Sequence, residues 1–127
     1  MVIEELERKI FITTDEHSGY FETWADNKRV AVVNWRLHPD KKIEIFGVET
    51  HQDYRGIGLM TKLFRYSIDY LKQHVKANSM FLHSCGTNKT AVRLYARNGF
   101  KVWKVQKFDN GTCYNMRLKL KGGKTNV

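Results

Sequence analysis

The clearest hydrophobic pattern in the chain runs over Gly58–Val75. Apolar residues recur there at steps of three or four positions, at Met60, Phe64, Ile68, Leu71 and Val75. This spacing places them on one face of an α-helix, while the charged residues fall largely on the other side. A shorter repeat of the same kind predicts a second helix over Lys89–Arg97. Asn98-Gly99 ends it, because glycine readily adopts the left-handed conformation after a helix.

Segments rich in β-branched and aromatic residues flank the two helices and predict strands. They are Gly19–Trp24, Arg29–Leu37, Ile43–Val48, Met80–His83, Lys101–Phe108 and Thr112–Leu120. Asp26-Asn27-Lys28 and Asp109-Asn110-Gly111 are turn signals and predict two hairpins. Ile10–Thr13 is a further short β-rich run, and Val2–Lys9 reads either as a short helix or as a frayed end. The expected order is β-β-β-α-β-α-β-β, an α+β fold with a mixed, mostly antiparallel sheet and two main helices.

The length of the chain, 127 residues, fits one domain over 1–120, followed by a flexible basic tail over 121–127. No stretch approaches the roughly 20 apolar residues that a transmembrane helix needs. The first ten residues lack the apolar segment typical of a signal peptide. We therefore expect a cytoplasmic protein without membrane contact.

Charge is distributed unevenly along the chain, whose formal net charge is +9. Residues 1–50 carry 7 basic and 10 acidic side chains, whereas residues 86–127 carry 10 basic side chains and a single acid, Asp109. Such an excess predicts an anionic partner, either a nucleic acid or a phosphorylated small molecule. The alternative is a charge that only keeps the protein soluble.

The two cysteines, Cys85 and Cys113, are too few for a disulfide framework, and we expect thiols in a reducing cytoplasm. The histidines follow no Cys-x-x-Cys or His-x-x-x-His pattern, so no metal site is expected. His83 and Cys85 are interpreted as residues of a partly buried strand end. A nucleophilic role for Cys85 is the alternative.

The segment with the most chemical information joins the third long strand to the first helix and reads Arg55-Gly56-Ile57-Gly58-Leu59-Met60. A helix N-terminus carries partial positive charge and unpaired N–H groups, and small residues there let a phosphate approach the backbone. These residues therefore predict a pyrophosphate site, with a plain turn as the alternative. They do not match a Walker loop or a Rossmann fingerprint.

A second motif follows one strand later and reads Asn-x-x-Ala-x-x-Leu-Tyr-x-x-x-Gly-Phe. Its residues are Asn88, Ala91, Leu94, Tyr95, Gly99 and Phe100. Together the two motifs resemble the GNAT superfamily of acyl-CoA-dependent N-acetyltransferases, whose cofactor loop is Gln/Arg-x-x-Gly-x-Gly/Ala. The resemblance covers about Ile43–Leu120. Only Met60 departs from the loop pattern, where the family has Gly or Ala.

The resemblance implies acetyl-CoA as co-substrate and a primary amine as acceptor, which attacks the thioester directly. The pantetheine arm would pair with the strand end like an added strand, and a backbone N–H near Val48 or Glu49 would polarise the thioester carbonyl. The cofactor contacts carried over are Val48, Glu49, Thr50, Arg55, Gly56, Ile57, Gly58, Leu59, Met60, Asn88 and Tyr95.

Three residues are catalytic candidates by the same resemblance. Tyr95 occupies the position of the tyrosine that helps to protonate the departing thiolate, with a simple packing role as the alternative. Glu44 is the first candidate for the general base, and burial would raise its pKa. Glu49 is the competitor. Strict alternation places the two glutamates on opposite faces of the strand, but a β-bulge between them would reverse this. A water chain is the third possibility.

The chain departs from the family where most members insert one or two helices over the acceptor site. Only Asp15-Glu16-His17-Ser18 stand between Thr14 and Gly19. The acceptor groove is therefore expected to be open, which suits a protein lysine or another macromolecular amine, or to be covered by a second subunit in a homodimer. Trp24, Trp35 and Trp103 are interpreted as core or sheet-face residues. Either of the first two is an alternative lining of the groove.

A competing function is a catalytically weak module on the same fold that binds acyl-CoA or nucleic acid. Basic residues of the C-terminal segment alternate with Trp103 and Phe108, which is compatible with nucleic-acid contact.

Overall fold

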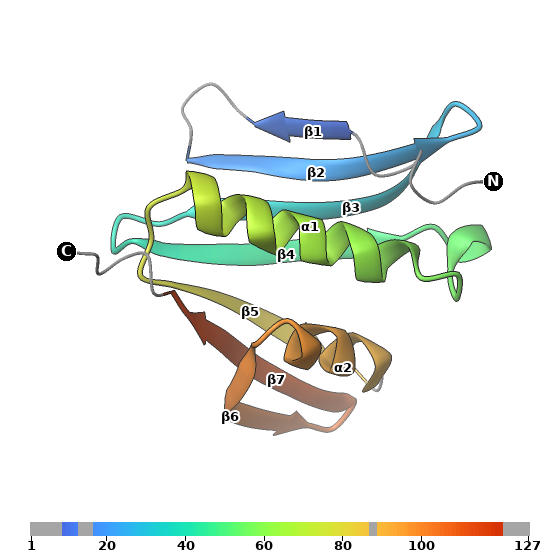
Figure 1. The fold of residues 1–127 in the computed structure, drawn as a ribbon. Helices are drawn as coiled ribbons and strands as arrows, with labels where there is room; N and C mark the ends of the chain where they lie inside the picture. Colours follow the sequence, from blue (N-terminus) through green and yellow to red (C-terminus); the bar gives the residue numbers. More distant parts are fainter. Residues whose placement is uncertain (1–8, 13–16, 87–88, 121–127) are drawn as a thin grey trace.

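The computed structural model describes residues 9–12, 17–86 and 89–120. Its strands form one seven-stranded sheet, and both helices lie on the same face of that sheet (Figure 1). The elements are β1 (Lys9–Ile12), β2 (Ser18–Ala25), β3 (Lys28–Leu37), β4 (Lys42–Thr50), the 3-10 helix η2 (Gln52–Tyr54), α1 (Leu59–His74), β5 (Ser79–Cys85), α2 (Lys89–Arg97), β6 (Lys101–Phe108) and β7 (Gly111–Lys119). Across the sheet the strands follow the order β1-β2-β3-β4-β5-β7-β6.

The predicted α+β class and the order of elements are confirmed, with β1 as an additional strand at the sheet edge. β1 corresponds to the short β-rich run over Ile10–Thr13. The alternatives for Val2–Lys9 concern residues outside the described part of the chain, except Lys9, which begins β1. The predicted tail over 121–127 also lies outside it. Within the described residues, no helix is long and apolar enough to span a membrane.

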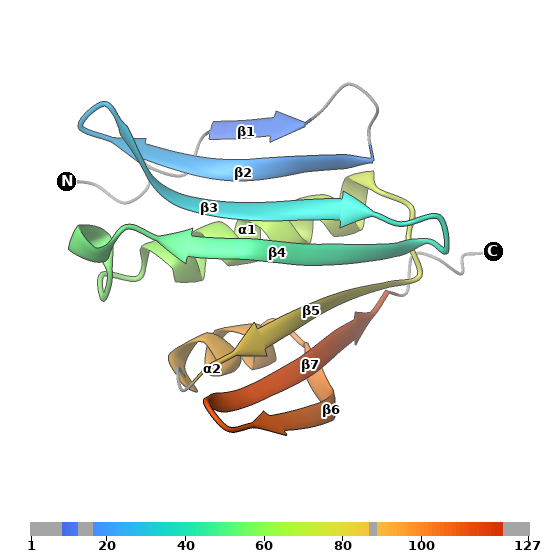
Figure 2. The ribbon, with the colours of Figure 1, turned by 180° about the vertical axis from the view of Figure 1, so that it is seen from behind.

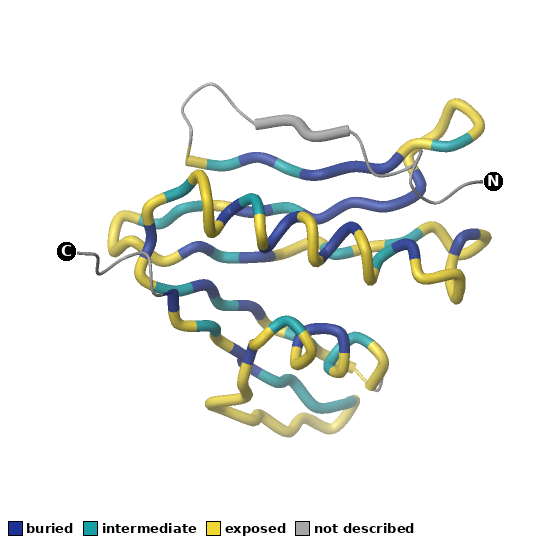
Figure 3. Tube along the Cα trace, viewed as in Figure 1, coloured by how far each residue is buried: buried dark blue, intermediate teal, exposed yellow. Residues whose placement is uncertain are grey.

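The core lies between α1 and the central strands. Apolar side chains on one face of α1, among them Leu63, Phe64 and Ile68, are buried in one core with residues of β2, β3 and β4. Figure 3 shows buried and exposed positions alternating along this helix. Phe64 also contacts the rings of Tyr95 and Phe100, so the same core continues under α2. The helical spacing of the apolar residues explains this burial, because it gives α1 one continuous apolar face.

A β-bulge interrupts the pairing of β3 with β4. The register shifts between Val32 and Asn34, and Gly47 takes a left-handed φ of 56° opposite this point. The side chain of Asn34 donates a hydrogen bond to the Gly47 carbonyl (3.1 Å), and a Cβ atom at Gly47 would lie 2.6 Å from the Asn34 amide nitrogen. Only glycine fits both the conformation and the space.

The bulge decides where the two candidate glutamates point. Glu44 pairs with Arg36 and Glu49 pairs with Val32. Paired residues share a face of the sheet, and Arg36 and Val32 stand four positions apart on β3, which also places them on one face. Glu44 and Glu49 therefore share the face opposite the helices, as expected only in the presence of a bulge.

β4 and β5 are the only parallel neighbours in the sheet described here. They pair only between residues 42–44 and 79–81, and beyond this point the two strands diverge (Figure 2). The edge of β4 from Ile45 to Thr50 that faces β5 therefore has no strand partner in the described chain. Such an edge can pair with an extended ligand.

The expectation of two free thiols is wrong. Cys85 and Cys113 stand directly opposite each other on β5 and β7, with their Cα atoms 4.0 Å apart, and their sulfur atoms form a disulfide. The register of an antiparallel pair brought together two residues that are 28 positions apart. A sulfur in a disulfide is not a thiolate, so the alternative role of Cys85 as a nucleophile is excluded in this state.

Candidate active site

The N-terminus of α1 presents unpaired backbone N–H groups to open space. Gly58 is the N-cap residue with φ of 81°, and no side chain makes a capping hydrogen bond there. Gly56 has φ of 79°, and a Cβ atom at either glycine would meet nothing within 4 Å. The glycines therefore permit the left-handed backbone and leave room for a ligand at the positive end of the helix.

Met60 does not obstruct this end of the helix. Leu59 is buried and Met60 is partly buried, and both side chains belong to the core or pack against it. The sequence pattern left open how a methionine fits where the family has Gly or Ala. In this structure the side chain is accommodated by the core.

Two side-chain hydrogen bonds hold the loop before α1. The Nε of Arg55 donates to the carbonyl oxygen of Thr50 (2.9 Å), which ties the loop to the end of β4. The hydroxyl of Tyr54 donates to Asp26 in the β2–β3 turn (2.7 Å). This hydrogen bond, followed by burial, raises the pKa of Tyr54, so its proton stays in place at neutral pH. The sequence predicted a turn at Asp26 but not this hydrogen bond, since no local pattern links residues 28 positions apart.

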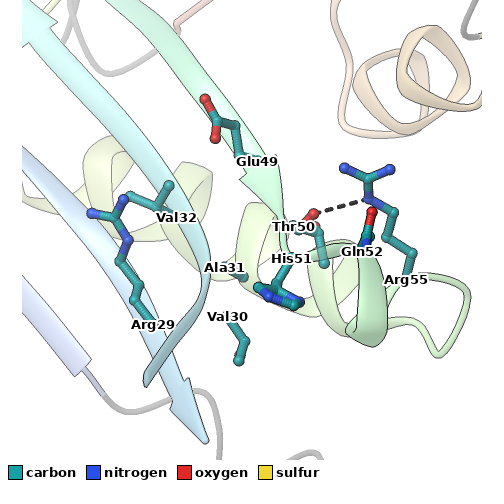
Figure 4. Close-up of a pocket in the computed structure, with 9 residues that line it drawn as sticks. All are labelled: Arg29, Val30, Ala31, Val32, Glu49, Thr50, His51, Gln52 and Arg55. Carbon is teal, nitrogen blue, oxygen red and sulfur yellow. Dashed lines mark hydrogen bonds between the residues drawn. The ribbon is translucent and has the colours of Figure 1, made fainter. Parts of the chain in front are cut away.

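A pocket of about 360 Å³ lies where β3 and β4 meet this loop (Figure 4). Its walls come from residues 29–32 on β3, from 49–52 at the end of β4, and from Arg55. Figure 4 shows the Glu49 side chain on β4, with Arg29 and Val32 on the neighbouring strand. Glu49 is exposed, and no described side chain makes a hydrogen bond or ion pair with it. Arg29, by contrast, is bonded to the buried Glu22 (3.2 Å).

Glu44 is in a different environment from the one predicted. Its side chain is 18% exposed, and one oxygen accepts hydrogen bonds from Arg36 (2.8 Å) and from His38 Nε2 (2.9 Å). Burial alone would raise the pKa of Glu44. The hydrogen bonds and the charges of Arg36 and His38 outweigh burial and lower this pKa below its ordinary value. The expected upward shift is therefore wrong, because basic rather than apolar neighbours surround the carboxylate.

Tyr95 lies where the two helices meet. It is 7% exposed, and its ring centroid is 5.1 Å from that of Phe64 on α1. Burial raises the pKa of Tyr95, so the phenol keeps its proton through the neutral range. Asn88, the other predicted contact of the second motif, lies outside the described residues.

The structure therefore brings most of the predicted cofactor residues to one end of β4. Val48, Glu49 and Thr50 end the strand, and the loop over 55–60 follows directly. Glu44 lies six residues before Thr50 on β4, which is roughly 20 Å along an extended strand. In the part of the chain that is described, no three His, Cys, Asp or Glu side chains gather in a group that could hold a metal ion.

Comparison with known proteins agrees with this arrangement. Residues 2–100 match the acetyltransferase (GNAT) family. No curated protein matches the chain by sequence.

Solved structures share the fold at low sequence identity. The ribosomal-protein-S18-alanine N-acetyltransferase of Escherichia coli superposes with a TM-score of 0.76 at 20% identity, over 88% of this chain and 75% of that chain. The ribosomal-protein-S5-alanine acetyltransferase of Vibrio fischeri superposes with a TM-score of 0.75 at 15% identity, over 87% of this chain and 66% of that chain. An acetyltransferase from Bacillus anthracis in complex with acetyl coenzyme A superposes with a TM-score of 0.68 at 13% identity, over 95% of this chain and 69% of that chain.

Proposed function

Because this chain belongs to the acetyltransferase (GNAT) family and is thus an acyltransferase with acetyl-CoA as co-substrate, we propose that it acetylates a primary amine carried by a macromolecule, by direct attack of the amine. The observation that carries this proposal is the open N-terminus of α1 beside the unpaired edge of β4. The first feature suits a pyrophosphate and the second suits an extended amide chain.

The residues present fit acetyl-CoA. The backbone N–H groups at 56–60 would hold its pyrophosphate, and Arg55, fixed by Thr50, adds a positive charge beside them. The main chain over Val48–Thr50 would pair with the pantetheine arm, and an N–H group of this segment would stabilise the oxyanion. Acetyl-CoA supplies the activated acyl group.

Proton transfer falls to two side chains of this chain. Tyr95, protonated at neutral pH, would donate to the departing thiolate. Glu49 is favoured as the group that accepts the proton of the amine, because it is exposed and unpaired and lines the pocket beside the loop. Glu44 is less suited, since Arg36 and His38 hold its carboxylate and its lowered pKa makes it a weaker base.

A macromolecular acceptor is favoured by the open face beside this site. β1 pairs directly with β2, and only five positions separate the end of the one strand from the start of the other. So short a connection cannot supply the crossing helices that roof the acceptor site in most family members. An amine on a large, protruding partner can therefore approach from this side.

The test is release of free thiol from acetyl-CoA in the presence of different amines. A peptide α-amine, a lysine peptide, a polyamine, an aminoglycoside and an aminoacyl-tRNA make a suitable panel. We expect turnover with a macromolecular or peptide amine, and turnover with the polyamine alone would contradict the proposal.

Gly58→Val should weaken CoA binding by about tenfold or more in calorimetric titration, because a side chain would cover the N–H groups. Val105→Ala, an exposed apolar residue on β6 outside this loop, is the control and should change it less than twofold.

A further inference from the structure

The face of the sheet opposite the two helices is uncovered in the described part of the chain (Figure 2). On its C-terminal half, a groove of about 570 Å³ runs across the beginnings of β4 and β5 and the neighbouring parts of β7 and β6. We call it the basic groove. It begins at Lys42. The loop over 55–60, which we propose to bind acetyl-CoA and call the acetyl-CoA loop, follows the far end of β4 at Thr50, roughly 26 Å along the strand. The basic groove is therefore a site apart from the acetyl-CoA loop.

Cationic side chains line the basic groove in register. Lys42 pairs with Ser79, and Ser79 pairs in turn with Lys119, so both lysines lie in one row across the sheet. Arg117 stands two positions before Lys119 on β7 and therefore on the same face. Asp40, exposed and 3.9 Å from Lys42 Nζ, is the only acid among the described residues that line the groove. The nearby carboxylate of Glu44 is neutralised by Arg36 and His38.

Aromatic rings lie between these cations. Trp103 lines the groove at a β-bulge of β6 and is 52% exposed, with the guanidinium of Arg117 5.3 Å from its ring centroid. Phe81 lines the groove from β5, between the rings of His38 (5.6 Å) and His83 (6.0 Å). All eight residues of β6 are exposed, among them the aromatic residues Trp103 and Phe108. Exposed apolar patches of this kind are typical of interaction surfaces.

We propose that the basic groove binds single-stranded nucleic acid. Trp103 offers its ring for stacking of a base, and Lys42, Arg117 and Lys119 neutralise phosphates. A row of cations interleaved with accessible rings is the combination by which proteins hold unpaired strands without reading their sequence. The excess of 10 basic over 1 acidic side chain within 86–127, more than one CoA molecule requires, fits a polyanionic ligand. An acidic peptide would satisfy the cations but would leave Trp103 without a flat ring to stack on.

Fluorescence anisotropy of labelled 12-nucleotide oligo(U) and oligo(dT) tests the proposal on the full chain with saturating CoA present. Three phosphate contacts predict that log K falls against log salt with a slope of about −2. Trp103→Ala should weaken binding about tenfold, while Trp103→Phe should restore most of it, since stacking needs only a ring. Trp24→Ala is the matched control, because Trp24 is exposed on β2 far from the groove, and it should have no effect.

The charge contribution has its own matched pair. Lys119→Gln should reduce the salt slope by about 0.7, whereas Lys72→Gln on α1, an exposed lysine on the helical face, should leave it unchanged. Binding of both oligonucleotides or a preference for one supports the proposal and shows whether the 2′-hydroxyl contributes. Three results would overturn the proposal. CoA could displace the oligonucleotide, or Trp103→Ala and Trp24→Ala could lose equal amounts of oligonucleotide affinity. A 12-residue polyglutamate could also bind as tightly as the oligonucleotide, with the same dependence on Trp103.

Discussion

The two halves of the sheet differ in what their side chains do. β3, in the half covered by α1, has five buried apolar residues, whereas β6 at the far edge has none. The first 50 residues of the chain are slightly acidic, and the last 42 are strongly basic. The α1 half holds most of the core and the glycine loop over 55–60. The second half joins it through the β4–β5 pairing and α2, and shows charged and aromatic residues to solvent.

Stability and surface chemistry are therefore separated along the sheet. The second half is held to the first by the β4–β5 pairing and by the contacts of Phe64 with Tyr95 and Phe100. Within the second half, the Cys85–Cys113 disulfide links β5 to β7. Because these contacts lie on the helical side or at a strand end, the residues of the outer strand β6 remain exposed.

The largest expected effect tests this separation on two phenylalanines. Phe21→Ala in β2 should lower the free energy of unfolding by about 3–5 kcal/mol, because the ring is fully buried against Tyr66 and Tyr70. Phe108→Ala in β6 should change it by less than about 0.5 kcal/mol, because that ring is 57% exposed. Urea unfolding measures both values. Similar losses in the two variants would show that the halves do not differ as described.

The disulfide should give the next largest effect. Reduction removes a cross-link between residues 28 positions apart and should lower the free energy of unfolding by about 3 kcal/mol. Urea unfolding with and without dithiothreitol measures this difference. A double variant, Cys85→Ser with Cys113→Ser, should match the reduced protein and ignore the reductant. If dithiothreitol leaves the free energy of unfolding of the wild type unchanged, the result would contradict the Cys85–Cys113 disulfide.

Tyr95 connects the two halves and is expected to affect turnover. Tyr95→Phe should lower kcat about a hundredfold, with the KM for acetyl-CoA within twofold, because a proton donor is lost while the ring remains. The raised pKa of Tyr95 places the high-pH loss of kcat above pH 10 in the wild type, since the phenol acts only while protonated. Steady-state kinetics across pH measures this limb. Tyr66→Phe, an exposed tyrosine on α1, is the control, and an equal loss there would remove the special role of Tyr95.

The smallest effect concerns Glu44. Its lowered pKa means that the ion pair with Arg36 and the hydrogen bond with His38 stabilise the fold at pH values above the unfolded carboxyl pKa, near 4.5. This contribution is lost as pH falls through the lower folded-state pKa. Glu44→Gln should therefore cost about 0.5–1 kcal/mol at pH 7, since Arg36 is half exposed, and progressively less on acidification. Thermal unfolding between pH 3 and 7 measures it. Glu49→Gln is the control, because it removes an unpaired carboxylate. An equally large loss of unfolding free energy in this variant would contradict the role of the Glu44 contacts.

Much of the fold was predictable because its signals are local. The apolar spacing in α1 and the turn residues at Asp26-Asn27 are visible in a few consecutive positions, and the structure has a helix and a hairpin there. The motifs at 55–60 and 88–100 likewise identified the family before any contact was known. The environment of Glu44 was not predictable, because Arg36 and His38 reach it through the register of two strands.

The helices, the glycine loop and the excess of positive charge could be read from the sequence, since each depends on neighbouring residues or on composition. Which side chains meet depends instead on how the strands pair in the folded protein. The bulge at Gly47 turned Glu44 and Glu49 to one face, and the β5–β7 register joined Cys85 to Cys113. Strand pairing also placed Trp103 beside Arg117 on an uncovered surface. Such contacts join residues far apart in the chain, and only the pairing of strands brings them within bonding distance.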